Sequence, residues 1–241
     1  VETWLSHLRE KRFDCVVNLT HDALSCWVMA ALGSPKIRGL SINSEGKTCA
    51  RDPWSLYILS LLRFRGQNLF NLADAYVHLS GGASVRERPQ YTIPDQSRKD
   101  ADAWLRHCAD NCLVGFQPGA NKPERRWPVS NFIRLGQQLA SSHNARILIF
   151  GAQDEGHLAR TIADALPGSL DFAGRTTIPQ LAALLERCRI LVTNDTGTMH
   201  LAAAVGTRIV ALFESSAYLR ETGPYGPGHW ILQSRELREY G

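Results

Sequence analysis

The second half of the chain alternates between short apolar runs and longer amphipathic stretches. Runs such as ILIF and RIVALF are apolar at consecutive positions, which is typical of parallel strands covered on both faces. Such runs occur at residues 113–116, 146–150, 170–172, 190–193, 209–213 and 230–232. Helical patterns lie between most of them, at residues 131–140, 158–166, 179–188 and 199–205. This alternation predicts an α/β fold with a doubly wound, Rossmann-like parallel sheet.

The first half of the chain has less strand character. Its pattern predicts a helix through Leu5 and Leu8, a strand over 15–19, a helix over 23–32, a short strand over 37–40, and helices over about 54–64 and 69–79. This is too little sheet for a complete α/β domain. A polar stretch over 81–100, rich in Gly, Pro and charged residues, separates the halves. We therefore predict an incomplete domain over 1–85, a linker over 86–100 and a Rossmann-like domain over 101–241.

Composition and charge narrow the class of protein. Hydrophobic residues make up 44% and charged residues 21% of the chain, which excludes a disordered chain and a collagen-like repeat. The net charge of +4 suits an anionic ligand or an acidic membrane surface, and no Lys/Arg run resembles a nucleic-acid-binding arm. The start of the chain lacks an initiator Met and a signal-peptide pattern, so we expect a cytoplasmic protein, either a fragment or natively short.

The six cysteines show no disulfide or zinc framework, so we expect reduced thiols and no metal site. Cys108 and Cys112 are spaced i and i+4 beside His107, which would place them on one face of a helix. Zinc sites usually combine a two-residue gap with a second pair of ligands, and both are missing from this pattern. We interpret the pair as part of a packed helix.

The loops that follow the strands carry the chemistry, because ligands of such sheets bind at the carboxyl ends of the strands. The richest loop is TNDTGTMH, residues 193–200, followed by the small residues LAAAVG. Asp195 or Thr196 can cap the helix that starts there, and the exposed N–H groups at its start form an anion site. The simpler interpretation is a well-capped helix in which His200 fills a gap.

Two further loops complement this one. In QPGANKPERRWP, residues 117–128, Gly119 permits close approach of the backbone, and three cations, Lys122, Arg125 and Arg126, suit phosphate oxygens. A solvated basic loop is the alternative. In GAQDE, residues 151–155, Asp154 can accept hydrogen bonds from ribose hydroxyls or act as an ordinary helix cap.

Taken together, the three loops resemble glycosyltransferase family 9, the ADP-heptose:lipopolysaccharide heptosyltransferases. The stretches QPGANKPERRWP, FGAQDE and DFAGRTTIPQLAALLERCRILVTNDTGTMHLAAAVGTRIVALF carry the match, and ETGPYGPG fits as well. The resemblance implies a GT-B fold of two Rossmann-like domains, with an incomplete acceptor-side domain before the linker and a donor-binding domain after it. It also implies inverting, metal-independent transfer of a sugar, heptose from ADP-heptose, onto a lipopolysaccharide core.

The resemblance also assigns roles to residues of this chain. The donor diphosphate is implied to contact Gly119, Ala120, Lys122, Arg125, Arg126, Thr196 and Gly197. The ribose is implied to contact Asp154 and Glu155, and the sugar Asp195, Thr198 and His200. No metal or cofactor is expected. The implied partners are the nucleotide sugar and a lipopolysaccharide-core or other glycolipid acceptor, with no nucleic acid and with peripheral contact at the cytoplasmic face of the inner membrane.

Departures from the family pattern leave alternatives open. The family's general base is an Asp in an early glycine–aspartate loop that this sequence lacks, so the base is expected to be missing from this chain, with His21 and Asp22 as stand-ins. A non-catalytic nucleotide-sugar binding module and a GT-B-like nucleotide-sugar epimerase are the alternative functions. A stripe of Trp54, Tyr57, Leu61, Arg63 and Arg65 is interpreted either as helix packing or as a membrane-facing surface.

Overall fold

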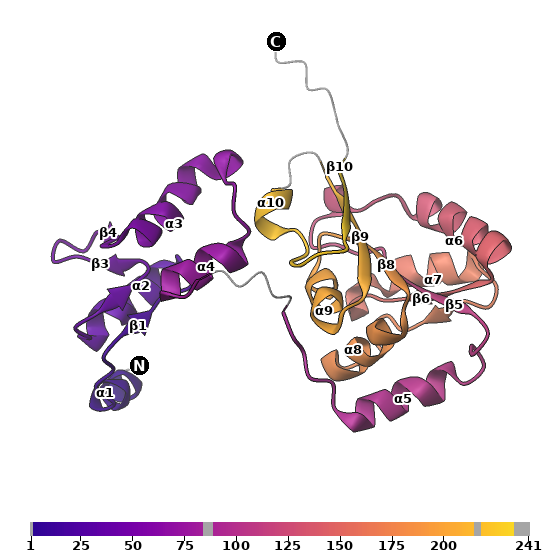
Figure 1. Ribbon diagram of the computed structural model, residues 1–241, viewed down its shortest axis with the longest axis horizontal. Coiled ribbons are helices and arrows are strands. Elements are labelled where there is room, and N and C mark those ends of the chain that lie inside the picture. Colours follow the sequence, from indigo (N-terminus) through magenta and orange to yellow (C-terminus); the bar gives the residue numbers. More distant parts are fainter. Residues whose placement is uncertain (1, 84–88, 215–217, 234–241) are drawn as a thin grey trace, which may run out of the picture. The chain divides into compact units, whose positions relative to one another are not determined.

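The computed structural model describes residues 2–83, 89–214 and 218–233, and it divides into two compact units, Val1–Val85 and Arg86–Gly241. Figure 1 shows the chain coloured from indigo at the N-terminus to yellow at the C-terminus. Each unit is described by itself. Part of the expected linker, residues 86–88, lies outside the described residues.

The second unit is built on a six-stranded sheet in which every described strand pair is parallel. The strands are β5 (Cys112–Gln117), β6 (Ala145–Ile149), β7 (Leu170–Asp171), β8 (Ile190–Asn194), β9 (Arg208–Phe213) and β10 (Trp230–Gln233). Their order is β10-β9-β8-β5-β6-β7. Each lies within two residues of the run that predicted it, so the Rossmann-like prediction is confirmed.

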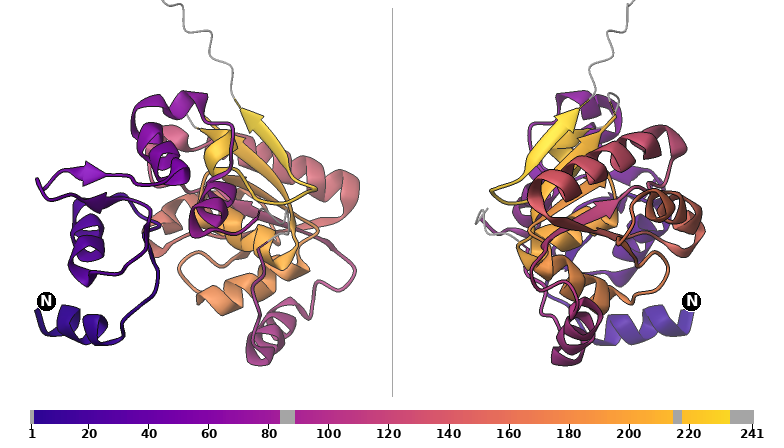
Figure 2. Two further views of the ribbon diagram at one scale, coloured as in Figure 1. Left: turned by 60° about the vertical axis from the view of Figure 1, so that its left-hand side comes forward. Right: turned by 90° about the vertical axis from the view of Figure 1, so that its right-hand side faces the viewer.

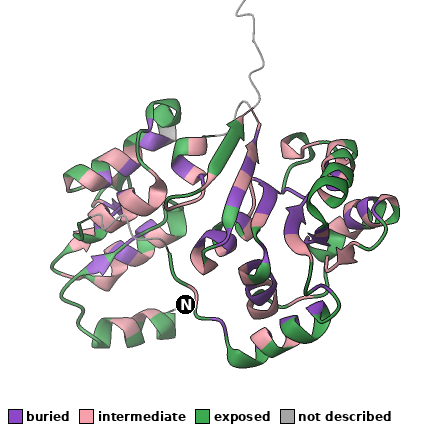
Figure 3. Ribbon diagram, turned by 45° about the vertical axis from the view of Figure 1, so that its right-hand side comes forward, coloured by how far each residue is buried: buried purple, intermediate pink, exposed green. Residues whose placement is uncertain are grey.

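Helices cover both faces of this sheet, as the views in Figure 2 show. They are α5 (Asp95–Leu105), α6 (Val129–His143), α7 (Gly156–Ala165), α8 (Ile178–Arg187), α9 (Gly197–Val205) and the short α10 (Leu219–Thr222). One core cluster joins the sheet to α5, α8 and α9, and a second joins it to α6 and α7. The adjacent residues Leu148 and Ile149 belong to different clusters, and both are fully buried. Successive side chains point to opposite faces of a strand, which explains the unbroken apolar runs. Figure 3 shows this burial along the central strands.

Part of the expected linker is helical. Residues 95–100, which the sequence pattern assigns to the linker, form the first half of α5, and α5 packs against α8. Arg98 forms an ion pair with Glu186 at 2.9 Å, and Gln180 Nε2 donates to Asp100 Oδ2 at 2.8 Å. The hydrogen bond from Arg98 lowers the pKa of Glu186. The charged residues that suggested a solvated linker therefore attach this helix to the second unit.

The predicted helix through Cys108 and Cys112 is wrong. Helix α5 ends at Leu105, Cys108 lies in the following turn and Cys112 begins β5. The turn forms because Cys108 N donates to the carbonyl of Leu105. Within the described ranges, no group of three His, Cys, Asp or Glu side chains is placed to hold a metal ion.

The first unit contains short strands and packed helices. Its elements are α1 (Glu2–Glu10), β1 (Val16–Val17), α2 (Ala23–Leu32), β2 (Ile37–Arg38), β3 (Ser41–Ile42), β4 (Thr48–Cys49), α3 (Pro53–Phe64), the 3₁₀ helix η1 (Arg65–Gln67) and α4 (Leu72–Ser80). Strands β1 and β2 pair in parallel, and β3 and β4 form an antiparallel hairpin that the pattern did not predict. Only two residues of the expected strand over 15–19 are paired, and Leu19 is exposed.

The stripe on α3 divides into two parts. Trp54, Tyr57 and Leu61 pack against α4, and Trp54 stacks on His78 with ring centroids 4.5 Å apart. Arg63 and Arg65 are exposed. The apolar part of the stripe therefore belongs to the interior of this unit. Among the described residues, no helix combines the length and the apolar composition that crossing a membrane requires.

Candidate functional site

The sheet order places a topological switch point between β5 and β8. These strands are neighbours, but the chain continues from β5 to β6 on one side and from β8 to β9 on the other. Loops that leave neighbouring strands in opposite directions open a crevice at the carboxyl ends of the strands, where ligands of such sheets bind. The loops of residues 117–128 and 194–200 leave the sheet at this point.

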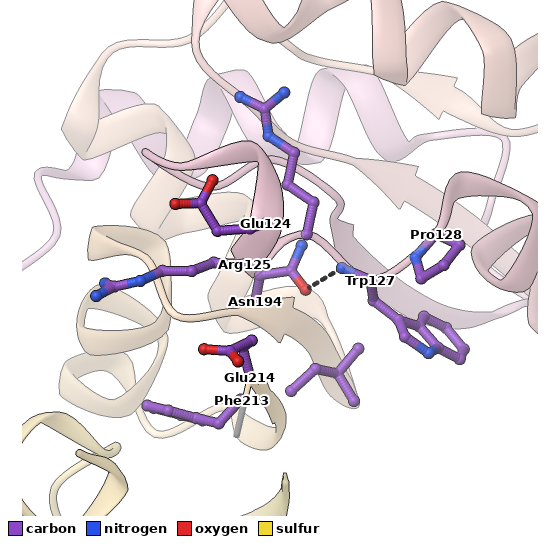
Figure 4. A pocket seen from close by; sticks show the side chains of 9 residues that line it. Glu124, Arg125, Trp127, Pro128, Asn194, Phe213 and Glu214 are labelled. Atoms are coloured by element: carbon purple, nitrogen blue, oxygen red, sulfur yellow. Dashed lines mark hydrogen bonds between the residues drawn. The ribbon is translucent and has the colours of Figure 1, made fainter. Parts of the chain in front are cut away.

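Asn194 connects these two loops. Its side chain is fully buried at the end of β8. Nδ2 donates to the carbonyls of Pro118 at 2.8 Å and Gly119 at 3.2 Å, and Oδ1 accepts from Trp127 N at 3.0 Å, the dashed line in Figure 4. One amide therefore holds both ends of the loop that follows β5.

The two arginines of the loop have different environments. Arg125 Nη1 lies 3.4 Å from Asp195 Oδ2, so this cation and the carboxylate after β8 form an ion pair at the switch point. Arg126 points to its own loop, because Nε and Nη2 both donate to the carbonyl of Ala120, at 3.1 and 2.9 Å. The Arg125 guanidinium thus lies at the switch point, whereas Arg126 shapes the loop.

Helix α9 starts beside this ion pair. Its N-cap residue is Thr196, but Thr196 makes no side-chain hydrogen bond to the helix, and its Oγ1 lies 3.2 Å from that of Thr193. Of the two expected caps, Thr196 is therefore wrong, since its hydroxyl faces the strand. Ala202 and Ala203 are buried against the sheet, which brings the backbone of the helix close to it. The N-terminus of a helix carries the positive end of the helix dipole, which favours an anion at the crevice.

A second network joins the loop of residues 151–155 to this site. Gln117, at the end of β5, is buried. Its Nε2 donates to Glu155 Oε2, and its Oε1 accepts from Thr198 Oγ1, both at 3.2 Å. Glu155 Oε2 also accepts from Ala152 N at 3.0 Å. Glu155 and Thr198, which the sequence suggested as ligand contacts, are thus part of the framework that aligns the three loops.

We expect Gly119→Ala to destabilise the second unit through this network. A Cβ at Gly119 would collide with the carboxylate of Glu155, which would have to leave Gln117 and Ala152. Losing these hydrogen bonds lowers the free energy of unfolding by about 1–2 kcal/mol. Chemical denaturation measures this value.

Gly156→Ala is the matched control, because a Cβ there meets no atom within 4 Å. Combining Gly119→Ala with Glu155→Ala tests the cause. The free energy of unfolding of the double variant should fall by less than the sum of the two single losses, because both changes remove the same interaction. Strict additivity would contradict the proposed collision.

The remaining residues of the predicted site lie around this framework. Lys122, Asp154, Gly197 and His200 are exposed, and Ala120 is buried. Partial desolvation lowers the pKa of His200, and the nearby Asp195 carboxylate opposes this shift. The shift favours the neutral imidazole, which can donate or accept a hydrogen bond.

A cavity of about 220 Å³ lies next to Arg125. In Figure 4, Glu124 and Arg125 line one side, Phe213 and Glu214 line another, and Trp127 and Pro128 lie beyond Asn194. Apolar walls with a few charged groups are typical of pockets for small polar ligands. The loop of residues 214–228 contributes Glu214, and its residues 215–217 lie outside the described part of the chain.

Sequence reasoning missed the residues that hold the site together. The sequence pattern places Gln117, Trp127 and Asn194 in loops, yet they supply the hydrogen bonds between the loops. A signal was available for Gln117 and Asn194, since a polar residue at the end of an apolar run has to find a buried partner.

Asp22 of the first unit is a helix cap. Its carboxylate accepts from Ser25 N at 2.9 Å and from Thr20 Oγ1 at 2.8 Å. The hydrogen bond from Ser25 N is the main cause that lowers its pKa to about 2. Such a weakly basic carboxylate is a poor acceptor for a hydroxyl proton.

Comparison with known proteins agrees with this arrangement. A family model described as glycosyltransferase family 9 (heptosyltransferase) matches residues 3–239. The chain is 34% identical over 232 residues to lipopolysaccharide heptosyltransferase 2 of Salmonella typhimurium and 33% identical over 232 residues to that of Escherichia coli. Each of these matches covers 87% of this chain and 62% of the relative, so the chain spans less than two thirds of their length.

Solved structures show the same fold. A family 9 glycosyl transferase from Veillonella parvula matches with a TM-score of 0.77 and 21% identity, over 97% of this chain and 67% of the other. The ADP-heptose lps heptosyltransferase II of E. coli matches with a TM-score of 0.65 and 20% identity, over 95% and 71%. These neighbours have the GT-B architecture that the sequence predicted.

Proposed function

The chain belongs to glycosyltransferase family 9, the heptosyltransferase family, and we propose that its second unit binds ADP-heptose as the donor of a sugar transfer. The acceptor is a sugar hydroxyl of the lipopolysaccharide core or another glycolipid. The transfer inverts the configuration at the anomeric carbon and needs neither a metal nor a cofactor. The enzyme works in the cytoplasm, in peripheral contact with the inner membrane.

The observation that carries this proposal is the meeting of Arg125, Asp195 and the start of α9 at the switch point. A nucleoside diphosphate is an anion that gains negative charge as it leaves the sugar. The Arg125 guanidinium and the first N–H groups of α9 would stabilise that charge in the transition state. These groups would supply the positive charge that a divalent cation supplies in other transferases.

Each loop has a role in this proposal. Gly119, Ala120, Thr196 and Gly197 bring backbone close to the diphosphate, and Lys122 adds a second cation at the exposed edge. Asp195 and His200 would hold the sugar through its hydroxyls, and the Thr198 hydroxyl, which donates to Gln117, would accept a further hydrogen bond from the sugar. Asp154 is the exposed carboxylate for the ribose, while Glu155 and Arg126 keep the loops in register.

The proposed chemical step is a displacement that inverts the anomeric carbon. The acceptor hydroxyl attacks the anomeric carbon from the face opposite the diphosphate, a new C–O bond forms, and the bond to the β-phosphate oxygen breaks. The hydroxyl proton passes to a base on the acceptor side. Asp22 caps helix α2 and its pKa is lowered to about 2, so it is unsuited to that task and we do not assign it the role.

Calorimetry and turnover test the proposal separately. We expect this chain to bind ADP-heptose more tightly than UDP-glucose or GDP-mannose, and EDTA to leave the affinity unchanged. The full-length protein should transfer heptose to a lipopolysaccharide core acceptor. Binding without turnover would favour the non-catalytic binding module, and a changed sugar without acceptor would favour the epimerase. No binding of any nucleotide sugar would refute the proposed site.

A further inference from the structure

The cavity beside Arg125 is too small for a whole nucleotide sugar. Its volume is about 220 Å³, whereas pockets that enclose a complete drug-sized ligand hold about 300–1,000 Å³. It lies at the end of β8, because Leu212 in its wall pairs in register with Asn194, and Asp195 follows Asn194 directly. The cavity therefore suits one part of a ligand whose remainder lies at the switch point.

The charges in its lining decide which part of the donor enters. Glu124 and Glu214 both line the cavity, drawn above and below Arg125 in Figure 4. A carboxylate repels phosphate oxygens, so the diphosphate is unsuited to this cavity. Hydroxyls donate hydrogen bonds to a carboxylate, and two neighbouring hydroxyls can donate to both of its oxygens. The lining therefore suits a neutral group that carries several hydroxyls.

Both carboxylates extend from backbone that is held in place. Glu124 is the middle residue of the 3₁₀ helix η2 (Pro123–Arg125), and the Asn194 amide holds the end of the loop that contains this helix. Glu214 directly follows β9, and its carbonyl accepts from Gln233 Nε2 of β10 at 3.1 Å. A site that is formed before the ligand arrives loses less conformational entropy when it binds, which favours discrimination between similar ligands.

We propose that this cavity receives the exocyclic side chain of the donor sugar and selects a heptose over a hexose. A heptose carries the diol CH(OH)–CH₂OH where a hexose carries a single CH₂OH group. The diol would donate hydrogen bonds to Glu124 and Glu214, and its carbons would face Leu212 and Phe213. The inference rests on the proposed function and extends it, because it names the residues that determine the choice of sugar.

Calorimetry of the chain with ADP-heptose and ADP-mannose tests this assignment. We expect ADP-heptose to bind at least about tenfold more tightly, because the shorter side chain of mannose leaves a carboxylate without its hydroxyl. In the double variant Glu124→Ala/Glu214→Ala, this preference should fall below about threefold. Its affinity for ADP alone should not fall, since removing carboxylates beside Arg125 reduces the repulsion of phosphate. Asp164→Ala, which removes an exposed carboxylate on α7, is the control and should keep the preference.

The single variant Glu124→Ala, at an exposed position, should already reduce the preference, and thermal unfolding shows that each variant folds. If the chain binds neither ADP nor either nucleotide sugar, the donor site is refuted and this assignment with it. If the parent chain binds ADP-heptose without preferring it to ADP-mannose, or if the double variant keeps the preference, the assignment alone is wrong. It is also wrong if the double variant weakens ADP as much as ADP-heptose, because the cavity then contacts the diphosphate.

Discussion

Replacing Asn194 by alanine is expected to lower the free energy of unfolding by about 2–4 kcal/mol. The change removes two hydrogen bonds to the carbonyls of Pro118 and Gly119 and one from Trp127 N. Because Asn194 is fully buried, water cannot easily replace the lost amide, and these backbone groups lose their partner. Urea denaturation followed by tryptophan fluorescence measures the loss.

The same substitution should impair the donor site. The loop that carries Arg125 is held at both ends by the Asn194 amide, so the folded variant should bind ADP-heptose at least about tenfold more weakly, a loss of roughly 1.4 kcal/mol. Calorimetry at a temperature where the variant is folded checks this. Asn121→Ala is the control, since Asn121 is an exposed residue of the same loop. A stability within about 0.5 kcal/mol of the parent chain would show that the buried amide does not hold the loop.

Arg125→Ala should weaken donor binding by about 10- to 100-fold. A charge-assisted hydrogen bond to phosphate contributes roughly 1.5–3 kcal/mol, which corresponds to that range of affinity. Stability should change little, because the ion pair with Asp195 is long and Arg125 is 36% exposed. Calorimetry with ADP and with ADP-heptose measures both effects. Arg134→Ala, at an exposed position on α6, is the control.

Asp195→Ala distinguishes recognition of the sugar from recognition of the diphosphate. If Asp195 holds the sugar, its loss should weaken the binding of ADP-heptose much more than the binding of ADP. Arg125→Ala should weaken the binding of both ligands. Near-native affinity for ADP-heptose in both variants would mean that the donor binds elsewhere. If Asp195→Ala instead loses the same affinity for ADP as for ADP-heptose, Asp195 orients Arg125 and does not hold the sugar.

Much of the second unit was predictable because its strands are buried on both faces. A run such as RIVALF has apolar residues on both sides of the strand, so its position in sequence marks its position in the sheet. Helix α8 carries its own start signal, in which Thr177 and Gln180 form a capping box. Where such local signals exist, the predicted boundaries agree closely with the structure.

The first unit and the linker were less predictable for a physical reason. Strands β1 and β2 are two residues long and, within the described part of the chain, pair with each other alone, so little periodicity marks them. In the linker, the charged residues that resembled a solvated segment form ion pairs and hydrogen bonds with α8. Residues 80 or more positions away decide such pairing, and a local pattern does not contain them.

The sequence by itself determined the parallel sheet and the three loops at its carboxyl edge, because burial and glycine placement leave a local pattern. Only the tertiary structure decided what each side chain of those loops contacts. Arg125 and Arg126 are adjacent and chemically identical, yet one meets Asp195 and the other the carbonyl of Ala120. Their directions depend on the backbone between β5 and α6, which Asn194 holds from another strand. The buried amide of Asn194, distant in sequence, thus fixes the backbone that directs Arg125 toward the proposed donor site and Arg126 toward its own loop.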